Sequence, residues 1–468
     1  MSDFYFERRL DKRVLISVIA TGILTFTGIC AETAMNVIFP TLMKEFSITT
    51  STVQWVTTIN LLMLAIIIPT SSWLKKCFLT RHIFMAAIAF FLGGTLLGLW
   101  SPSFSVLIIG RVLQGIGTGM ALPMMSNIII EQVPTKNTAT IMGCATLTIA
   151  LGPALGPALG GAIVGIAGWR MIFAALVPFV ILSAIGGITC LYQSSAIEKQ
   201  PFDMKGFLML ALCFSCLLVP LSNISHWGVE SPAIWALIAV ALIFLWLFKR
   251  HCDKRETPLL NLSVLRTSAF SFCLVALLIC QFITLARGFM IPNFFQLSNG
   301  TSAFIAGCIV LPACIIGAAM NPFAGRIYDA IGPRVPITIG FLLILTDSVL
   351  EMFFMRHVSA YVMMAICVLY CLGQSLSTGN TITFSLRNLD PARTADGTAI
   401  INTMQQLFGA VGTAVASTVV SFGQGAHPDD IALGTSVGVQ WSLYMIFGLA
   451  IVMVVCALRG LASGRTSK

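Results

Sequence analysis

The chain has 468 residues, of which 57% are hydrophobic and only 10% are charged, and its mean hydropathy is +0.93. This composition does not suit a surface exposed to water, so it excludes a soluble enzyme. About 20 apolar residues cross a bilayer, so fourteen crossings would take roughly 280 residues, which is close to the apolar share of this chain. No polar stretch is long enough to fold separately, which excludes a receptor with a large extramembrane domain.

Apolar runs separated by polar or Gly/Pro residues predict the helices in chain order. Six helices are expected near 13–38, 51–74, 82–100, 104–130, 138–165 and 170–192. A linker over 193–205 leads to two shorter runs, 206–222 and 233–249, with a polar turn at 223–232 between them and a basic stretch up to residue 266. Six more helices are expected near 268–297, 303–325, 335–355, 360–384, 395–421 and 437–458.

This pattern of six, two and six runs predicts an all-α polytopic membrane protein with fourteen transmembrane helices. We expect an N-terminal six-helix bundle in residues 1–192, and a linker with an inserted helix pair and a basic cytoplasmic loop in 193–267. Residues 268–468 would form a C-terminal six-helix bundle and a short cytoplasmic tail.

The basic residues indicate how the chain is oriented. Of the 27 Lys and Arg residues, 22 fall at the two termini or in loops expected on the cytoplasmic side. Lys44, Arg170 and Arg356 would lie outside, and Arg111 and Arg287 lie within spans. The positive-inside rule therefore predicts a multi-pass protein of the inner (cytoplasmic) membrane with both termini in the cytoplasm. The net charge of +9 is explained by topology, so no nucleic acid is expected as a partner.

Cysteine and histidine positions limit the chemistry. The 14 Cys residues fall in spans or on the cytoplasmic side, so no disulfide framework is expected. The five His residues lie in loops or at helix ends, so no metal site is expected, and no nucleophile and base form a catalytic pair. We therefore expect no catalytic residues and no cofactor.

Two loops indicate an internal repeat. The loop after the run 303–325 reads Gly325-Arg-Ile-Tyr-Asp329-Ala-Ile-Gly332-Pro-Arg334, and the loop after the run 51–74 is its equivalent, Ser72-Trp-Leu-Lys-Lys76-Cys-Phe-Leu79-Thr-Arg81. Two related six-helix halves fit a transporter whose substrate site lies at their interface.

The most specific pattern is a glycine series in the expected helix 138–165. Residues i, i+4 and i+8 lie on one face of a helix, so this series leaves a strip without side chains where another helix can pack closely. A proline within the series removes a backbone donor and loosens the helix, which makes this segment a candidate hinge. The alternative is a packing seam with no role in movement. The series is Gly143, Gly152, Gly156, Pro157, Gly160 and Gly161.

This spacing resembles in full the antiporter motif of the major facilitator superfamily. Arg111-Val-Leu-Gln114-Gly115-Ile-Gly117 is similar to the fourth-helix motif of that superfamily, and Ala31 to Pro40 to the first-helix motif of its fourteen-helix drug:proton antiporters. Pro258 to Leu262, Ala306-Gly307 and Leu311-Pro312 also resemble that family. The resemblance covers essentially the whole chain. It implies the major facilitator fold and a secondary active transporter, with the proton gradient as its energy source and without a cofactor.

The chain departs from the family pattern in two places. Glu32 stands where the family usually has Asp, which keeps the charge on a longer arm. Lys76, Leu79 and Thr80 replace the acidic, glycine and basic residues expected in the first-half loop, whereas the second-half loop keeps Asp329, Gly332 and Arg334. We therefore expect the cytoplasmic gate to depend mainly on the second loop.

Glu32 is the main candidate for proton coupling, because a carboxylate within a span is costly unless it is neutralised or paired. The alternative is a permanently paired structural acid. At 1.5 Å per residue, Glu32 and Arg287 lie roughly 27 Å from the cytoplasmic face, and Arg111 roughly 9 Å below the outer face. We hypothesise that Arg111, and also Arg287, pairs with Glu32 in one conformation and separates from it in another. The alternative for Arg287 is a side chain that reaches to the outer interface.

Two further sets of polar residues are candidates. Asp347 and Glu351 share one helix face, and Asp347 is the better candidate for a second proton site. The alternative is a structural role or a side chain that reaches to the interface, since Glu351 lies near the outer end of its helix. Polar residues at mid-membrane depth predict a mostly apolar substrate cavity, although each could instead form hydrogen bonds between helices. The predicted cavity residues are Asn36, Asn60, Gln114, Gln281, Arg287, Tyr370, Gln374, Asn402 and Gln405, with Phe26, Phe289 and Phe295.

Together these features predict an antiporter that exports hydrophobic, often cationic drugs or toxic compounds from the cytoplasm in exchange for protons. Its partners would be the small-molecule substrate, protons and the lipid bilayer; a periplasmic adaptor is left open. One alternative is a dedicated exporter of one anionic or zwitterionic metabolite, which two intramembrane arginines would suit. The other is a membrane sensor that transports nothing.

Overall fold

The structure, a computed structural model, describes residues 11–193, 197, 201–228, 230–255, 258–390 and 393–464. Within these ranges, the side chains of residues 135–140, 143, 144, 146, 147, 149, 150 and 226 are not described. Five of the basic residues used to predict topology, Arg8, Arg9, Lys199, Arg465 and Lys468, lie outside the described residues. The described part is helical and contains no strand, which confirms the predicted all-α class.

The first part of the chain forms a bundle of long helices with short helices at their ends. Its elements are α1 (Lys12–Val37), α2 (Phe39–Phe46), α3 (Thr50–Val53), α4 (Trp55–Ile67), η2 (Ile68–Thr70), α5 (Ser71–Cys77), α6 (Thr80–Leu99), α7 (Phe104–Gln132), α8 (Thr135–Ala167) and α9 (Arg170–Cys190). We call α1 to α9 the N-terminal half.

A helix pair and a second bundle follow. The pair consists of α10 (Met204–Trp227) and α11 (Pro232–Lys254), and η3 (Leu262–Arg266) leads from it to the second bundle. We call α12 to α18 the C-terminal half. Its helices are α12 (Ser268–Leu297), α13 (Ala303–Cys308), α14 (Leu311–Ile331), α15 (Arg334–Phe354), α16 (Ala360–Arg387), α17 (Thr394–Ala426) and α18 (Ile431–Ser463).

Thirteen helices in the described part are long and apolar enough to span a membrane. The 33-residue α8 is not among them, but its segment Leu151–Ala167 is also apolar, so α8 is the fourteenth long helix in the chain. The number of long helices thus agrees with the predicted fourteen spans. The division of the chain into domains at residues 192 and 267 stays a prediction.

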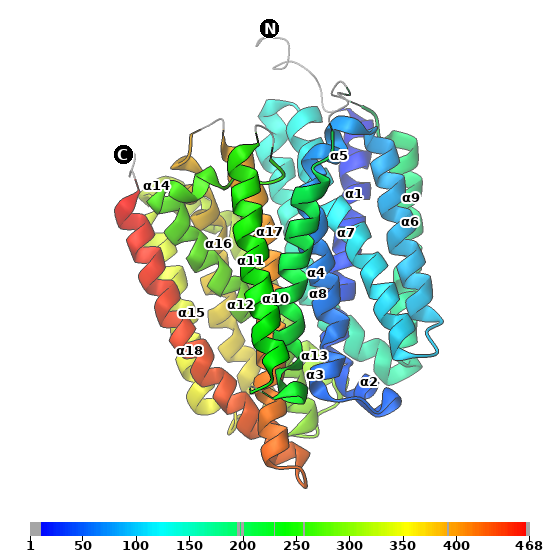
Figure 1. The fold of residues 1–468 in the computed structure, drawn as a ribbon, viewed down its shortest axis with the longest axis vertical. Coiled ribbons are helices and arrows are strands. Elements are labelled where there is room, and N and C mark those ends of the chain that lie inside the picture. The colour runs from blue at the N-terminus through cyan, green and yellow to red at the C-terminus, as the bar shows by residue number, and fades with distance from the viewer. Residues whose placement is uncertain are drawn as a thin grey trace.

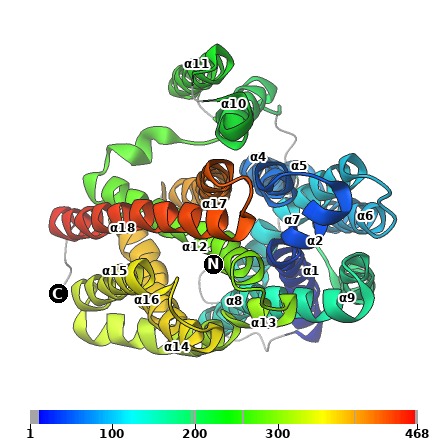
Figure 2. The same ribbon diagram turned by 90° about the horizontal axis from the view of Figure 1, so that it is seen from below.

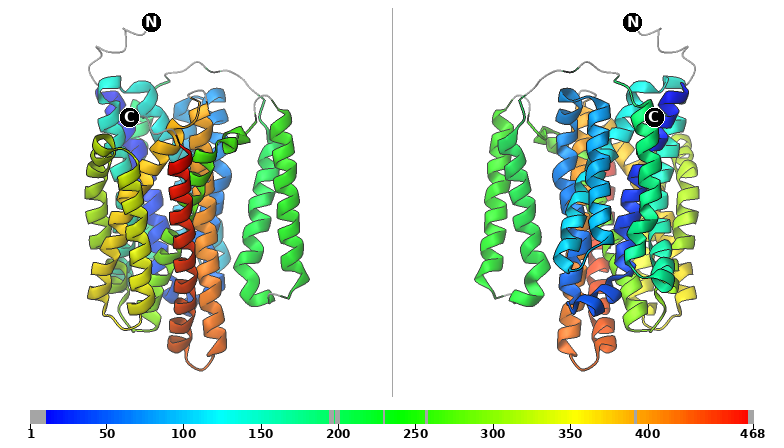
Figure 3. Two further views of the ribbon diagram at one scale, coloured as in Figure 1. Left: turned by 90° about the vertical axis from the view of Figure 1, so that its left-hand side faces the viewer. Right: turned by 90° about the vertical axis from the view of Figure 1, so that its right-hand side faces the viewer.

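The two halves lie side by side, and the helix pair stands at their flank. The first residues of α1 and the last of α18 lie at the same end of the molecule, which we call the termini end (Figure 1). The other end, which holds α2 and the turn between α17 and α18, we call the far end. Figure 2 shows α1 and α12 near the centre, with α10 and α11 outside the two bundles. In Figure 3 these two helices form a separate hairpin beside α4 and α17.

The halves are joined chiefly by four helix pairs: α4 with α17, α8 with α13, α8 with α14, and α1 with α12. The hairpin attaches through α10, which packs on α17 and α4. One polar contact supports this attachment, because the Thr418 hydroxyl donates to the carbonyl of Leu221 at 2.9 Å.

Several helices extend past the ends that hydropathy predicts. The polar turn predicted from residue 223 is partly wrong, since α10 continues to Trp227. Asn223 caps its own helix by donating to Val219 O at 2.8 Å, and the helix ends at Gly228, whose φ of 75° suits glycine. The helices α17 and α18 likewise continue beyond the apolar run and project together at the far end (Figure 1). Polar residues can continue a helix in water, so hydropathy marks the membrane portion and not the helix end.

Candidate functional site

The glycine series of α8 packs against two different neighbours. Gly152, Gly156 and Gly160 face α1: a Cβ atom on Gly152 would lie 2.6 Å from Ile29 Cγ2, and one on Gly160 would lie 2.9 Å from Ala34 O. A Cβ atom on Gly156 would overlap the Thr33 hydroxyl, and that hydroxyl lies 3.3 Å from the carbonyl of Gly152. The predicted close approach of another helix is confirmed, and the helix is α1.

The remaining residues of the motif face the other half of the protein. The carbonyl of Pro157 meets Gly307 of α13, and Gly161 meets the backbone of Ala303. One helix is therefore held against α1 on one face and against the C-terminal half on the other. Gly143 also lies in α8, but its surroundings belong to the stretch whose side chains are not described. The role of the series as a hinge stays a prediction.

Glu32 lies on α1 next to this seam and is 6% exposed. Among the described residues, no hydrogen bond and no ion pair within 4 Å involves Glu32. Its electrostatic partner is Arg111 of α7, at a longer range than an ion pair. The structure therefore places the two residues in one region without joining them.

Arg111 is held mainly by backbone and amide groups. Its Nε donates to Val56 O at 2.9 Å, and its Nη1 donates to Gln114 Oε1 at 2.7 Å. The third nitrogen, Nη2, is buried without a hydrogen-bond partner. Because a buried guanidinium donor without a partner is unfavourable, this nitrogen is available to a carboxylate that moves closer.

Three of the predicted cavity residues form hydrogen bonds in the N-terminal half, and two of them contact Arg111. Gln114 donates to Thr95 Oγ1 at 2.9 Å while it accepts from Arg111, and Asn60 donates to the carbonyl of Arg111 at 3.1 Å. Asn36 accepts from the Thr57 hydroxyl at 2.9 Å. In this conformation their side chains serve as hydrogen bonds between helices, which is the alternative that the sequence left open.

The other predicted cavity residues lie in the C-terminal half. Tyr370 shares a 2.6 Å hydrogen bond with Thr284, and Gln374 donates to the same hydroxyl at 3.2 Å. Gln281 is half-buried beside Gly409 of α17. Asn402 is exposed, Gln405 and Phe26 are half-buried, and Phe289 and Phe295 are buried in the core of the C-terminal half. A role for any of them in substrate binding stays a prediction.

In this conformation Arg287 has other partners than Glu32 and does not reach the membrane interface, and its pairing with Glu32 in another conformation stays a prediction. Arg287 is 4% exposed and forms ion pairs with Glu351 and Asp347 of α15. It therefore neither reaches the membrane interface nor contacts Glu32. Glu351 is also fully buried instead of lying at the surface. Matching depths were the signal that could have predicted this pair, because Arg287 and Glu351 both lie roughly 27 Å along helices that start at the termini end.

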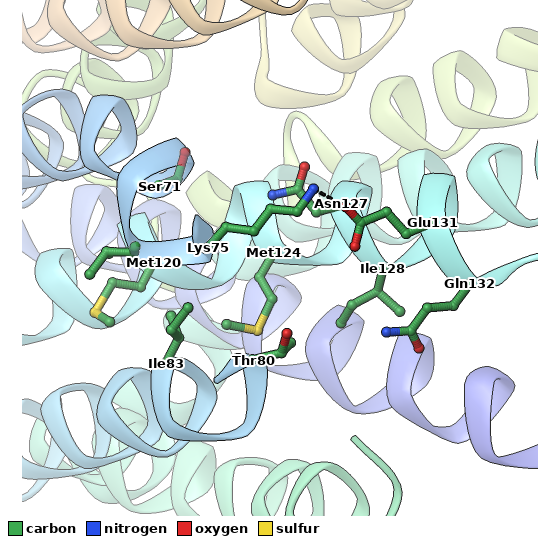
Figure 4. A pocket seen from close by; sticks show the side chains of 11 residues that line it. Ser71, Lys75, Thr80, Ile83, Met120, Met124, Asn127, Ile128, Glu131 and Gln132 are labelled. Carbon is green, nitrogen blue, oxygen red and sulfur yellow. Dashed lines mark ion pairs between the residues drawn. The ribbon is translucent and has the colours of Figure 1, made fainter. Parts of the chain in front are cut away.

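The loops of the internal repeat differ in their contacts. In the first half, Lys75 of α5 forms an ion pair with Glu131 of α7. The backbone N–H and the hydroxyl group of Thr80 both donate to Gln193 Oε1 at 2.9 Å. Lys75, Thr80 and Glu131 border a small pocket between α5, α6 and α7, and Figure 4 shows Lys75 reaching across it to Glu131. The sequence analysis did not predict this ion pair, because Lys75 lies one residue before the motif position, Lys76.

The second-half loop is less engaged. Asp329 and Arg334 are exposed, and neither forms an ion pair with a described residue. Gly332 ends α14 with a φ of 82°, a conformation that favours glycine. In this conformation the ion pair of the two loops lies at the first loop, and the role of the second loop as the cytoplasmic gate stays a prediction.

The far end is closed by contacts between the halves. Thr50 donates to Gln424 Oε1 at 2.7 Å, Gln296 donates to Val37 O at 2.8 Å, and Asn293 donates to Asn36 O at 3.4 Å. Beside them, α2 is tied to α9, because Glu45 accepts from Trp169 Nε1 at 2.6 Å and pairs with Arg170 at 2.8 Å.

This helix architecture agrees with comparisons to known proteins. The sequence model of the Major Facilitator Superfamily matches residues 21–413. The chain belongs to this superfamily. It is therefore a multi-pass membrane transporter, and the resemblance inferred from its motifs is confirmed.

Relatives and solved structures agree with this assignment. The lincomycin resistance protein LmrB of Listeria monocytogenes is 33% identical over 458 residues, which cover 95% of this chain and 96% of LmrB. LmrB of Bacillus subtilis is 31% identical over 95% of this chain and 94% of its own. A bacterial homologue of the human lysosomal transporter Spinster, solved in an inward-facing, unoccupied conformation, has a TM-score of 0.67 at 16% identity, covering 98% of this chain and 100% of that one. That last likeness concerns the fold alone.

Proposed function

We propose that this transporter is a proton-coupled antiporter of the inner membrane that exports hydrophobic, often cationic drugs from the cytoplasm. The termini end would face the cytoplasm, so the closed far end would be the outer one. Export of a drug is supported by the LmrB relatives, whose names state lincomycin resistance.

The observation that carries the proposal is that Glu32 is buried without a contacting partner. It is a buried carboxylate that no described residue holds by a hydrogen bond or an ion pair, and it lies beside the seam between α1 and α8. A membrane-buried acid without a fixed partner is a group whose proton can be exchanged. A permanently paired structural acid would have its partner in contact, so this geometry favours the coupling role.

Arg111 gives the coupling a physical basis. Its free Nη2 can bind the Glu32 carboxylate once the proton has left, and the ion pair would then replace the proton. A change that moves α1 and α7 relative to each other would alter this pairing, and with it the proton affinity of Glu32. Antiport requires only that the substrate and the proton compete for binding and that their affinities differ between the two conformations.

The structure weakens the argument for an anionic substrate. Two intramembrane arginines favoured that alternative, but Arg287 is already neutralised by Glu351 and Asp347. Arg111 Nη2 is buried without a hydrogen-bond partner, but this guanidinium has Glu32 as its electrostatic partner. A neutral or cationic substrate therefore fits the charges of the described residues better than an anionic metabolite does.

The experiment uses inside-out vesicles with an acidic interior and a pH-sensitive dye. Lincomycin and tetraphenylphosphonium are added separately to vesicles with wild-type protein, Glu32→Gln or Glu32→Asp. We expect either compound to evoke proton release in wild type, Glu32→Asp to keep part of it, and Glu32→Gln to lose it.

The alternatives give different results. Release by anionic compounds and by neither of the two probes would support the metabolite exporter. A folded wild-type protein that releases no protons with any compound would support the sensor. Full release by Glu32→Gln would place the coupling at another residue.

A further inference from the structure

A second group of buried charges lies in the C-terminal half, between α12, α15 and α16. Arg287 Nε donates to both carboxylate oxygens of Glu351 at 3.1 Å, and its Nη2 lies 2.5 Å from Glu351 Oε1. Asp347, one helical turn earlier on α15, lies farther from the same Nη2, at 3.4 Å for Oδ1 and 3.3 Å for Oδ2. Both carboxyl groups are fully buried, at 0% exposure.

The charges of this group do not balance if both acids are ionised. The other titratable groups that face it come from α16, and they are Cys367, Tyr370 and Cys371, which are neutral in their ordinary forms. The ring of Tyr370 stacks under the guanidinium at 3.9 Å, and Cys367 Sγ accepts from Nη2 at 3.6 Å. Cys280 of α12 and Cys314 of α14 are the nearest titratable groups of those helices. No second cation from the described residues contacts the group.

Two carboxyl groups therefore share one guanidinium in a region of low dielectric. An uncompensated negative charge there is strongly unfavourable, and protonation of one carboxyl group removes it. The geometry indicates which one, because Glu351 takes the bidentate contact that an ionised carboxylate prefers. Asp347 has only the long contacts to Nη2, and its Oδ2 is buried without a hydrogen bond.

We propose that Asp347 and Glu351 hold one proton between them, carried on Asp347 in this conformation, and that the transporter releases this proton during its cycle as a second proton-binding site. The release step rests on the proposed antiport function. The presence of the proton does not, since it follows from the charges and contacts of the three side chains.

A chain of hydrogen bonds leads from Tyr370, which stacks on Arg287, into the interior of the C-terminal half. The Tyr370 hydroxyl shares a hydrogen bond with Thr284 and lies 3.4 Å from Cys280 O, and Gln374 bonds to the same Thr284 hydroxyl. Thr284 and Gln374 are half-buried, whereas the two acids are fully buried. Movement of α12 against α15 would change the contact of Arg287 with both acids, and the proton would then be released or rebound.

Infrared absorption of the purified protein in detergent tests whether the proton is present. A protonated carboxyl group has a carbonyl stretching band that shifts in D₂O, and ordinary carboxyl groups lose this band above about pH 5. We expect wild type and Glu32→Gln to retain such a band at neutral pH. In the Glu32→Gln background, where a protonated Glu32 adds no band, Asp347→Asn should lose it. Glu351→Gln should lose it there as well, because the single remaining carboxylate then ionises against Arg287.

The two variants keep the test decisive if one of them fails to fold, which size-exclusion chromatography would show. A band that is unchanged in a folded Asp347→Asn or Glu351→Gln variant of the Glu32→Gln background would overturn the proposal. Absence of the band from wild type in sodium buffer, with its return in choline buffer, would also overturn it, because a bound sodium ion would then balance the charge.

The release step is tested by the number of protons exchanged per tetraphenylphosphonium or lincomycin molecule in proteoliposomes. We expect this ratio to fall from about two to about one in Asp347→Asn. An unchanged ratio together with the loss of the infrared band would show a resident proton and overturn the release step. Absence of exchange in wild type would refute the antiport function, while the infrared result would still decide the proton site.

Discussion

Gly161 of α8 lies against the backbone of Ala303 so closely that a methyl group on Gly161 would overlap the Ala303 carbonyl. The two residues belong to opposite halves of the transporter, and their contact adjoins that between Pro157 and Gly307. Gly156, one turn away on a different face of α8, packs equally closely on α1. The antiporter motif therefore forms two seams, one within the N-terminal half and one between the halves, and the two can be tested separately.

Substitution of Gly161 by Leu should impair closure of the far end. The added side chain would separate α8 from α13 at a cost of about 1–3 kcal/mol, which corresponds to a loss of exchange of roughly tenfold or more. The rate of substrate-evoked proton release measures this effect. Gly165→Leu is the matched control, because no atom lies within 4 Å of a Cβ at Gly165 on the same helix. Equal rates for the two variants would show that this contact does not matter for transport.

Substitution of Gly156 by Val should lower stability, because this seam lies within one half. The nearest obstacles are the Thr33 hydroxyl and the carbonyl of Cys30, so we expect a loss of about 1–3 kcal/mol. Thermal unfolding in detergent measures it. Because Thr33 is the closest neighbour, Thr33→Ala should recover part of the loss in a double-mutant cycle. Gly93→Val, at a site with open space, should be near neutral, and a similar loss there would argue against the seam.

Removal of the Arg287 guanidinium should destabilise the C-terminal half. Arg287→Ala leaves Glu351 and Asp347 buried without a cation, and loss of one partner of a buried ion pair costs about 3–5 kcal/mol. A double variant with Glu351→Gln should be more stable than Arg287→Ala alone, since one unpaired carboxyl group is gone. Thermal unfolding of the single and double variants checks this order, and the reverse order would contradict the pairing.

The hairpin of α10 and α11 should depend on pH through Asp203. This residue precedes α10 and accepts from Gly206 N at 3.1 Å, from His251 Nε2 at 2.8 Å when that nitrogen carries a proton, and from Arg255 at 3.2 Å. Burial alone would raise the pKa of Asp203, but the hydrogen bonds from His251 and Gly206 and the charges of His251 and Arg255 bring it below the ordinary value.

A lowered pKa in the folded state means that the stabilisation is complete above the ordinary Asp pKa of about 3.9 and is lost as the pH falls below it. We therefore expect Asp203→Asn to lower the thermal midpoint at neutral pH and to match wild type at the acid end. The lost charge interactions should cost about 1 kcal/mol, and the helix cap should change little because Asn is as good an N-cap residue as Asp. Asp253→Asn, at an exposed site on α11, is the control and should show no such convergence. A difference between Asp203→Asn and wild type that is constant with pH would exclude this role of the charge.

The sequence predicted the helices well where hydropathy governs them and less well at their ends. The fourteen apolar runs all correspond to long helices, because the bilayer requires a minimum apolar length. The continuation of α10 to Trp227 and of α17 to Ala426 was missed. These segments are polar enough to lie in water, where capping and glycine positions decide where a helix ends.

The candidate site was predicted in part. Glu32, Arg111 and the glycine strip were identified from residue type and spacing, and the structure places all three in one region. The pairing of Arg287 with Glu351 and Asp347 in this conformation was not predicted, because depth along a helix does not say which face points to which neighbour. The ion pair of Lys75 with Glu131 and the cluster of Asp203 with His251 were also missed.

By itself, the amino-acid sequence determined the membrane class, the number of long helices and the superfamily, since these depend on composition, apolar length and local motif spacing. Only the tertiary structure decided which charges are paired, because pairing depends on how helices distant in the chain are rotated against one another. Arg287 and Glu351 are 64 residues apart and meet only when α12 packs beside α15. Gly156 and Gly161 belong to one motif, yet their helix turns them toward different halves of the protein, so the same local pattern serves two contacts.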